Sequence, residues 1–321
     1  MKILHVITSL LTGGAEKLMV DLLPRLSAEG HQVDLCLFNG TDTPFKQLLA
    51  HTDVRIYSFG TGSVYNPLHI LRLARLIRRE RYDIVHTHNT APQLFGALAS
   101  MLCSVVLCTT EHTTSNRRRG SKWYVLIDRW MYSRYQKVIC ISDKTESALR
   151  ESLNGFPIPA LTIYNGIDVA KIHSAKSANF DKQALKCSIA LVQVAGFRYQ
   201  KDQKTVVKAL LRLPESVHVF FIGDGIQKNE VVEMAHSLGV EHRTHFMGIR
   251  SDVPAILKAA DIVVMSSHYE GFGLAAVEGM AASKPVIASD VDGLREVVAG
   301  AGITFTPGDA NDLADKIKSL I

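Results

Sequence analysis

Residues 261–281 read DIVVMSSHYEGFGLAAVEGMA, and this stretch shows most clearly the pattern that decides the fold. Asp261–Met265 is a short, largely apolar run typical of a buried strand, and Leu274–Ala282 has the small and apolar residues of a packed helix. A polar loop with two glycines joins them. The stretch therefore predicts a strand, a loop and a helix in succession, which is how a βαβ unit begins.

The same alternation of short apolar runs and longer amphipathic segments extends over the whole chain. In the first half we expect strands over 2–8, 32–38, 83–87, 105–109 and 137–141, and helices over 15–29 and 70–80. The pattern then begins again, with strands expected over 189–194, 217–222, 244–247, 261–265 and 285–288, and helices over 203–211, 229–238, 253–260 and 274–282. Alternation of this kind predicts parallel sheets with helices on both faces.

The restart predicts two doubly wound α/β domains in tandem. The length of 321 residues agrees, since a domain has roughly 150. The segment 165–180 is polar and weakly patterned, so we place the joint there and expect domains over 1–167 and 168–321. Ligands of open α/β sheets bind at the carboxyl ends of the strands, and two such domains facing each other would enclose a ligand cleft.

Composition limits the class of protein further. Hydrophobic residues make up 47% and charged residues 21% of the chain, which argues against a disordered protein. The apolar start has no cleavage site of a signal peptide, and no run reaches the roughly 18 apolar residues that a membrane span needs. The five cysteines form no CxxC pair. We therefore expect a cytoplasmic protein with reduced thiols and no zinc ribbon.

The net charge of +5 is unevenly distributed. The first 165 residues contain 19 Lys and Arg against 13 Asp and Glu, whereas the rest of the chain contains 17 against 18. Much of the excess lies in Arg72–Arg81 and Arg117–Arg119. Such stretches are often only solvated surface, but they also suit an anionic lipid, and Trp123 and Tyr124 suit a headgroup interface. Because no nucleic-acid-binding motif accompanies the charge, we expect no nucleic-acid partner.

Two glycine-containing loops are candidates for binding an anion. The first, Gly13-Gly14, follows the first expected strand and opens a helix, where backbone N–H groups can approach a phosphate closely. It lacks the G-x-G-x-x-G pattern of dinucleotide sites, and the chain contains no P-loop pattern. A tight turn that binds no ligand is an equally good interpretation of this loop.

The second loop lies between two glutamates. The N–H groups of Phe272, Gly273 and Leu274 would point out of the helix end toward a diphosphate or a sugar hydroxyl. Glu278 lies one helical turn past Leu274, so its carboxylate and that of Glu270 can face the same ligand. Carboxylates accept hydrogen bonds from paired ribose hydroxyls. The alternative is a helix cap with a solvated glutamate.

These loops give the chain a resemblance to a known family. Glu270 and Glu278, with Gly-Phe-Gly-Leu between them, resemble the E-x7-E motif of retaining group 1 glycosyltransferases (glycosyltransferase family 4). Similar segments follow the family's order along most of the chain: Gly13–Glu16, Asp83–His88, Tyr164–Asp168, Phe221–Gly225, Ala259–Ile262, Lys284–Val291 and Gly293–Glu296. Thr110–Thr113 and Asn116–Arg119 resemble the subgroup that builds capsular and exopolysaccharide repeats.

The resemblance implies a GT-B fold, in which two Rossmann-like domains face each other across a cleft. The N-terminal domain would bind the acceptor and the C-terminal domain a nucleotide-sugar, most simply a UDP-sugar. The donor contacts implied by the family pattern are Gly13, Gly14, Gly248, Ile249, Arg250, Phe272, Gly273, Leu274 and Glu278, the last on the ribose. The catalytic residues implied are Glu270 on the transferred sugar, Lys201 on the diphosphate and His112 on the acceptor side. Asn116, Arg117, Arg118 and Arg119 would meet the acceptor or the membrane.

The sequence departs from the family at one position. The family usually has an arginine five residues before the lysine, and Gly196 occupies that place here. Arg198 lies two residues later and could reach the same phosphates, so we include it among the catalytic candidates. Loss of one such preorganised donor costs roughly 3–4 kcal/mol of transition-state stabilisation in known enzymes.

The implied reaction moves a hexose or an N-acetylhexosamine, with retention, to a polysaccharide-repeat acceptor linked to a lipid diphosphate. Cations and oriented N–H groups would stabilise the leaving diphosphate, so we expect no metal and no cofactor. Asp290-Val291-Asp292 matches a metal motif of another fold, which we interpret as coincidence. His86 and His88 share a strand face, but no third metal ligand is suggested.

Two other functions fit the same pattern. A nucleotide-sugar 2-epimerase of the same fold would need no acceptor. A degenerate partner of another transferase, without donor binding, is favoured to some extent by Gly196. The location we expect is cytoplasmic, with peripheral contact at the inner membrane face. Family chains usually close with further helices, so the end at Ile321 leads us to expect a truncated chain.

Overall fold

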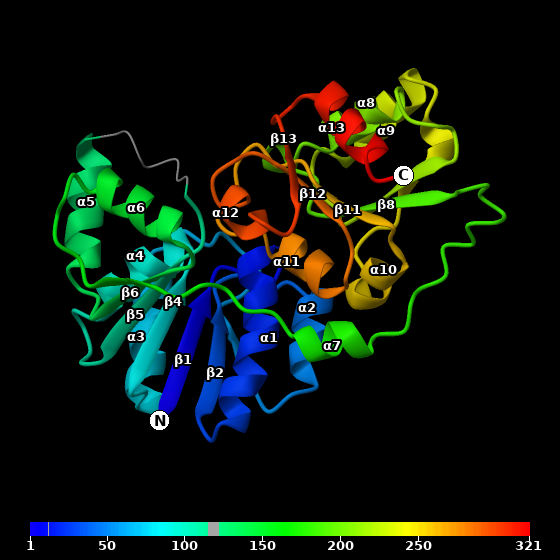
Figure 1. The fold of residues 1–321 in the computed structure, drawn as a ribbon. Coiled ribbons are helices and arrows are strands. Elements are labelled where there is room, and N and C mark those ends of the chain that lie inside the picture. The colour runs from blue at the N-terminus through cyan, green and yellow to red at the C-terminus, as the bar shows by residue number, and fades with distance from the viewer. Residues whose placement is uncertain (12, 115–121) are drawn as a thin grey trace. The chain divides into compact units, whose positions relative to one another are not determined.

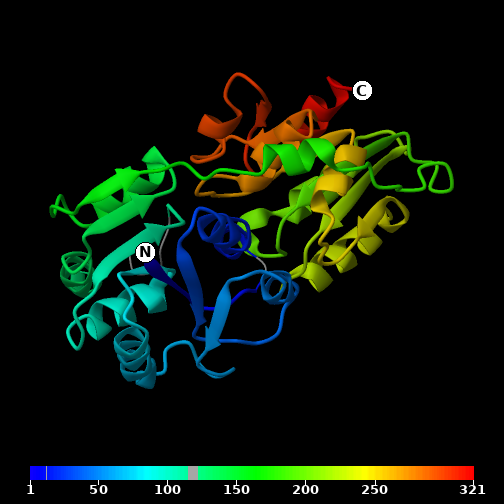
Figure 2. The same cartoon turned by 90° about the horizontal axis from the view of Figure 1, so that it is seen from below.

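The computed structural model describes residues 1–11, 13–114 and 122–321. It divides the chain into two compact units, Met1–Asn165 and Gly166–Ile321. Each unit contains one parallel sheet with helices around it (Figures 1 and 2). No helix in the described ranges has an apolar stretch long enough to cross a bilayer.

The first unit has a seven-stranded sheet in the order β3-β2-β1-β4-β5-β6-β7. Its strands are β1 (Lys2–Ile7), β2 (Gln32–Leu37), β3 (Arg55–Ser58), β4 (Ile84–His88), β5 (Val106–Glu111), β6 (Lys137–Cys140) and β7 (Ala160–Thr162). Its helices are α1 (Gly14–Ala28), α2 (Pro44–Ala50), α3 (Leu68–Glu80), α4 (Thr90–Ala99), α5 (Lys122–Tyr132) and α6 (Asp143–Ser152). The five strands expected from the sequence are all present, with ends that differ by one or two residues.

The two faces of this sheet have separate cores, as the alternation along each strand requires. Leu4 and Val6 pack with α3, α4 and α5, whereas Ile7 packs with Met19 and Leu23 of α1. All of these side chains are fully or almost fully buried. The first sheet is therefore covered on both faces, as a doubly wound domain should be.

The second unit has a six-stranded sheet in the order β10-β9-β8-β11-β12-β13. Its strands are β8 (Ile189–Val194), β9 (Val217–Ile222), β10 (Thr244–Phe246), β11 (Ile262–Met265), β12 (Val286–Ser289) and β13 (Ile303–Phe305). Its α-helices are α7 (Val169–Ser174), α8 (Gln203–Leu210), α9 (Lys228–Ser237), α10 (Val253–Ala259), α11 (Leu274–Ala281), α12 (Arg295–Val298) and α13 (Ala310–Lys318), with 3₁₀ turns at Tyr199–Lys201 and Glu241–Arg243. Two core clusters lie on its two faces.

Each sheet reverses its strand order at one place. The chain moves outward from β1 to β3 and then returns to pair β4 with the other side of β1. In the second unit it moves from β8 to β10 and returns to pair β11 with β8. Because all strands in a sheet are parallel, the loops that follow β1 and β4, or β8 and β11, diverge at the same edge and leave room for a ligand.

Helix α11 is held against the second sheet through a glycine. A Cβ on Gly279 would lie 3.1 Å from three side-chain atoms of Val263 on β11, which is closer than ordinary contact. Any larger side chain must push the helix off the strand. The position of the amino end of α11 thus depends on a residue with no side chain.

We therefore predict that Gly279→Leu lowers the free energy of unfolding by about 1–3 kcal/mol through overpacking. Urea denaturation followed by circular dichroism measures the change. Gly62→Ala is the matched control, because its added Cβ meets nothing within 4 Å, and it should behave like the wild type. A wild-type unfolding midpoint for Gly279→Leu would show that α11 does not pack this closely.

Candidate active site

A lysine and a glutamate meet where the second sheet reverses. Lys201 follows β8, Glu270 follows β11, and the Lys201 ammonium forms an ion pair with the Glu270 carboxylate. Both side chains are about three-quarters or more buried. The second carboxylate oxygen accepts a hydrogen bond of 3.2 Å from the N–H of Gly271. Two residues predicted separately from the sequence are thus brought into direct contact.

Buried hydrogen bonds hold the lysine's backbone in place. The amide of Gln193, on β8, donates to the Lys201 carbonyl over 2.9 Å. The hydroxyl of Ser266, just past β11, lies 2.9 Å from the same carbonyl and 2.8 Å from that of Asp202. Gln193 and Ser266 are themselves joined by a hydrogen bond of 3.0 Å, and both are buried. The loops after β8 and β11 are therefore joined to each other by buried hydrogen bonds.

The amino end of α11 lies next to this ion pair in the sequence. Gly273 is its N-cap, has a φ of 81°, and provides no side-chain cap. A residue other than glycine would be strained there, and its Cβ would clash with Leu294. Phe272 is buried just before the helix, and Glu278 lies partly buried one turn after Leu274. The first turn thus presents its N–H groups without a capping side chain, which suits an anion.

The loop after β8 carries the departure from the family pattern. Arg198 is exposed, and its guanidinium forms no ion pair with the residues that the structure describes. Its Nε lies 4.0 Å from the place that a Cβ on Gly196 would occupy. The Arg198 side chain therefore extends back across the position where the family has its arginine.

The turn after β9 packs against the loop that follows β8. Gly225 has a φ of 159°, and a Cβ on it would clash with the backbone of Phe197. The N–H of Phe197 donates to the carbonyl of Asp224 over 3.1 Å. The structure thus gives the turn at Asp224 and Gly225 a packing role against the loop that carries Arg198.

The loop after β10 carries three of the residues that the resemblance implies as donor contacts. Gly248 has a φ of 66°, and its carbonyl accepts a hydrogen bond of 2.8 Å from Gly223. Ile249 is exposed. The Arg250 guanidinium forms two hydrogen bonds with the Asp252 carboxylate, at 2.8 and 2.7 Å, and these hold the pKa of Asp252 below its usual value. The Arg250 charge is thus already paired within its own loop.

In the first unit, Gly13 and Gly14 begin α1 after β1. Gly13 is the N-cap, in an extended conformation, and its carbonyl accepts the 2.9 Å hydrogen bond from Lys17. The Glu16 carboxylate folds back over Gly13, so that a Cβ on Gly13 would clash with it. Glu16 is the third residue of the helix, from which a glutamate caps the amino end. A carboxylate of the protein thus lies where we expected an anion to bind.

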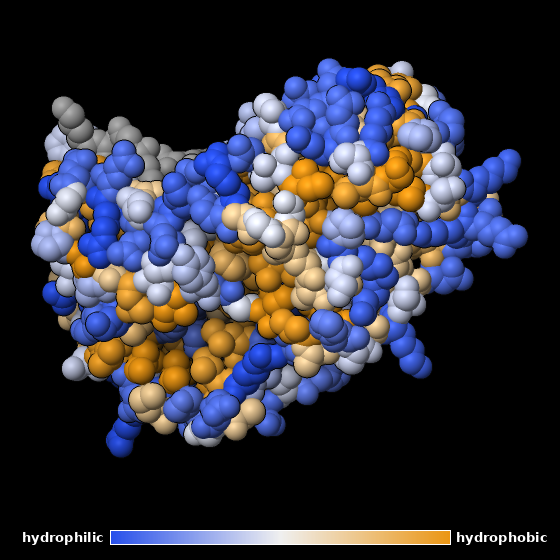
Figure 3. All heavy atoms as spheres, in the orientation of Figure 1, coloured by the Kyte–Doolittle hydropathy of each residue, from blue (hydrophilic) through white to orange (hydrophobic). Residues whose placement is uncertain are grey.

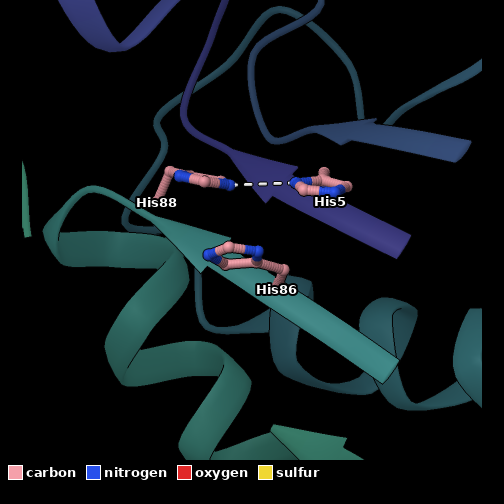
Figure 4. A group of neighbouring side chains, drawn as sticks. All are labelled: His5, His86 and His88. Atoms are coloured by element: carbon pink, nitrogen blue, oxygen red, sulfur yellow. Dashed lines mark hydrogen bonds between the residues drawn. The ribbon is translucent and has the colours of Figure 1, made fainter. Parts of the chain in front are cut away.

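Four histidines gather at the reversal point of the first sheet. His5 on β1 is opposite His86 on β4, His88 ends β4, and His112 follows β5. His5, His86 and His88 offer ring nitrogens within 4.8 Å of one another (Figure 4). Our expectation that His86 and His88 have no third neighbour of metal-ligand type is therefore wrong. The signal was available, since His5 lies on the strand that pairs with β4 in a doubly wound sheet.

Burial keeps these histidines neutral. It lowers the pKa of His86 to about 4 and that of His112 to about 3, and the neighbouring His86 imidazole adds to the effect on His112. The pKa values of His5 and His88 are also well below the ordinary value for the same reason. At neutral pH each ring therefore carries one N–H and one lone pair.

Two further groups of residues singled out in the sequence are the basic segment after β5 and the D-x-D sequence. Asn116, Arg117, Arg118 and Arg119 lie outside the described residues. Asp290 and Asp292 both form ion pairs with Arg295, at 2.5 and 3.2 Å. The two carboxylates of this D-x-D sequence are thus occupied by a cation of the protein itself.

Two protein-family models match the chain, one in each unit. The model Glycosyltransferase Family 4 matches residues 12–171, and the model Glycosyl transferases group 1 matches residues 176–321. Between them they leave unmatched only residues 1–11 and 172–175.

Curated relatives carry names of the same kind. An uncharacterized glycosyltransferase of Methanocaldococcus jannaschii, MJ1178, is 27% identical over 87% of this chain and 77% of its own length. The Escherichia coli UDP-Gal:alpha-D-GlcNAc-diphosphoundecaprenol alpha-1,3-galactosyltransferase is 27% identical over 78% of this chain and 69% of its own length.

Solved structures agree on the fold. Anabaena Alr3699/HepE, crystallised with UDP-glucose, has a TM-score of 0.85 with 24% identity, over 99% of this chain and 89% of that one. The expected GT-B architecture of two Rossmann-like domains is thereby confirmed. Since the two family models together span nearly all of its residues, the chain belongs to the glycosyltransferases, with a family 4 amino-terminal domain and a group 1 carboxy-terminal domain.

Proposed function

We propose that the protein transfers a hexose or an N-acetylhexosamine from a UDP-sugar, with retention and without a metal, to a growing polysaccharide repeat on a lipid diphosphate. The second unit would bind the donor and the first unit the acceptor. The observation that carries the proposal is the contact between Lys201 and Glu270 beside the uncapped amino end of α11.

This arrangement suits the departure of a nucleoside diphosphate. As the bond from the anomeric carbon to phosphate breaks, negative charge accumulates on the diphosphate and positive charge on the sugar ring. The Lys201 ammonium and the N–H groups at Gly273 would stabilise the negative charge on the diphosphate. The Glu270 carboxylate would stabilise the positive charge on the sugar ring. A diphosphate bound at Lys201 would compete with Glu270 for the ammonium, so the present ion pair keeps both groups in position before the substrate arrives.

Arg198 would supply a second cation. Its guanidinium reaches back over Gly196, and it is not engaged by an acidic partner among the described residues. Two cations and a helix end together can neutralise most of a diphosphate's charge, which is why we propose a reaction without a metal. The leaving phosphate can then accept the acceptor's proton, so no protein nucleophile is required. Glu278 would accept hydrogen bonds from the ribose hydroxyls.

The substrate class rests on the relatives. The name of the Escherichia coli relative specifies a UDP-sugar donor and a diphosphoundecaprenol-linked acceptor. The Anabaena structures contain UDP, glucose or UDP-glucose. The basic first unit is compatible with an anionic acceptor of this kind.

Helix α5 supports contact with a membrane surface. Trp123, Leu126, Ile127 and Trp130 follow the spacing of one helical face and are all exposed, Trp123 by 79% and Leu126 by 59%. The opposite face buries Met131 in the core. In the sequence, three arginines precede this helix and are separated from it by Gly120 and Ser121. An apolar face with basic residues beside it is typical of helices that lie in the interface of an anionic bilayer.

The basic helix α3 is a weaker candidate for the same contact. Arg72 donates to the carbonyl of Phe59 over 2.7 Å, Arg78 donates to the carbonyl of Leu102, and Arg79 pairs with Glu80 at 3.0 Å. These arginines are thus engaged within their own unit. Figure 3 shows hydrophobic side chains among hydrophilic ones at the end of the first unit that carries α5.

The two alternatives predict different results in the same assay. With UDP-sugars and a lipid-diphosphate acceptor, a transferase releases UDP and forms a new glycosidic bond. A 2-epimerase converts the donor without any acceptor, and a degenerate partner binds no UDP in calorimetry. Absence of both UDP binding and turnover with every donor would refute the proposal.

We predict that Lys201→Ala lowers kcat by roughly 100- to 1000-fold, because a preorganised cation at the leaving group is lost. UDP release measured against donor concentration gives the value. Lys182→Ala is the matched control: Lys182 forms a 2.5 Å ion pair with Asp261, next to the opposite end of β11. A similar loss in both variants would mean that Lys201 acts only through stability.

We predict that Arg198→Ala lowers kcat, and that Gly196→Arg in the same chain restores part of it. A side chain at 196 has ordinary space, since its Cβ would lie 3.4 Å from the nearest atom, the carbonyl oxygen of Asp224. The measurement is the rate of UDP release for the two single variants and the double variant. If Arg198→Ala keeps the wild-type rate, the second cation is not needed.

We predict that the double variant Trp123→Ala, Leu126→Ala sediments with phosphatidylglycerol-containing vesicles at least about tenfold less than the wild type. The control is Leu68→Ala, Leu71→Ala, whose side chains on α3 are exposed by 53% and 57%. Equal vesicle binding by the wild type and the α5 variant would place the membrane contact elsewhere or nowhere.

A further inference from the structure

Three imidazoles form a hydrogen-bonded row across the first sheet. His5 Nδ1 lies 3.1 Å from His88 Nε2, and His88 Nδ1 lies 3.0 Å from His112 Nε2. His88 therefore uses both of its ring nitrogens. The row begins in the middle of β1 and ends just past β5, at the carboxyl edge where ligands of such sheets bind.

The neutral state of the rings decides how this row behaves. Each neutral imidazole has one donor and one acceptor, and each of the two N···N contacts uses one of each. His112 Nε2 is thereby committed to His88, whichever way the protons are ordered. The nitrogen that His112 has left for a ligand is Nδ1.

The inner end of the row shows that it does not conduct protons to solvent. His5 Nε2 is buried and has no hydrogen-bond partner among the described residues. A proton arriving there has no group to accept it. The row of hydrogen bonds thus ends at His5 Nε2. Its effect on His112 is to set the orientation of the ring and to decide which ring nitrogen is left for a ligand.

A metal site formed by His5, His86 and His88 is the competing interpretation. Metal ligands direct their lone pairs toward one common point. Figure 4 instead shows His88 and His5 directing nitrogens at each other along the line of the hydrogen bond. His86 Nε2 is engaged by the Thr110 hydroxyl over 2.7 Å, and its ring stacks on that of His88 with a centroid distance of 4.4 Å. His5 Nδ1, His88 Nε2 and His86 Nε2 are therefore already used in hydrogen bonds.

We propose that His88 and His5 are positioning residues, which hold the ring of His112 by Nε2 and present its Nδ1 to a hydroxyl of the sugar substrate. His86 supports the row from below by stacking on His88. The inference rests on the proposed function, because it takes the ligand at this edge to be the sugar substrate. It assigns a task to a buried histidine, His88, that need not touch the substrate itself.

Two substitutions of His88 separate its two bonds. The side-chain amide of Asn reaches about as far as Nδ1, and that of Gln about as far as Nε2. We expect His88→Asn to keep the bond to His112 and most of kcat. We expect His88→Gln to lose that bond and to lower kcat by roughly 10- to 100-fold, since misplacing a reacting group by about 1 Å costs that much. UDP affinity by calorimetry should stay unchanged in both variants.

A pair of histidines in the other unit provides the control. His218 Nδ1 and His245 Nε2 are 2.9 Å apart, with stacked rings, on β9 and β10. His245→Asn removes a comparable imidazole contact, because the shorter Asn amide does not reach the place of Nε2. We expect it to keep the wild-type kcat, so that a general loss of stability is distinguished from loss of positioning.

A second readout does not depend on turnover. Long-range ¹H–¹⁵N NMR reports the state of each ring nitrogen, and His112 Nε2 should change in His88→Gln but not in His88→Asn. An unchanged His112 spectrum with wild-type kcat in His88→Gln would overturn the inference while leaving the proposed function intact. Stoichiometric Zn²⁺ binding that His5→Asn abolishes would overturn it in favour of a metal site. If the wild type neither binds UDP nor turns over, the proposed function fails, and with it the sugar ligand of His112.

Discussion

Parallel pairing of β1 with β4, and of β8 with β11, is the constraint on which both units depend. In a parallel sheet all carboxyl ends lie at one edge, so residues at the ends of these strands are neighbours even when 69 or 83 positions separate them. Lys201 and Glu270 come together in this way, as do His5 and His88. The strand order, rather than any local motif, places chemically active side chains in contact.

The two places where the strand order reverses differ in how their buried polar groups are stabilised. In the second unit the groups are charged, and they keep partial access to water, with 26% of the Lys201 side chain and 18% of the Glu270 side chain exposed. Opposite charges in contact also offset part of the desolvation. In the first unit the rings of His5 and His88 are buried, and burial there favours the neutral imidazole over the charged one. The histidines of the first unit thus offer hydrogen bonds, whereas Lys201 and Glu270 of the second unit offer charge.

Sequence patterns predicted ten of the thirteen strands in the described ranges, because buried parallel strands are short apolar runs bounded by polar residues. The edge strands β3, β7 and β13 were not predicted. They missed α4, since seven of its ten residues are buried and no polar face marks a helical period. The resemblance named Lys201 and Glu270, but their contact follows from the order β8-β11, which no single motif contains. His5 was overlooked for the same reason: within β1 it is one more residue of a buried strand, and its neighbours in space are on β4. The Glu16 carboxylate over Gly13 depends on a side-chain rotamer, which local sequence does not specify.

The replacement of the family's arginine by Gly196 follows the same logic on a smaller scale. Gly225 packs against the backbone of Phe197, and the Asp224 carbonyl accepts the Phe197 N–H, so this part of the loop is fixed before Arg198 begins its side chain. A long side chain leaving a fixed point can cover a place two residues back, as the 4.0 Å approach of Arg198 Nε to the missing Cβ shows. This approach is the basis of our proposal that Arg198 supplies the cation that the family has at position 196.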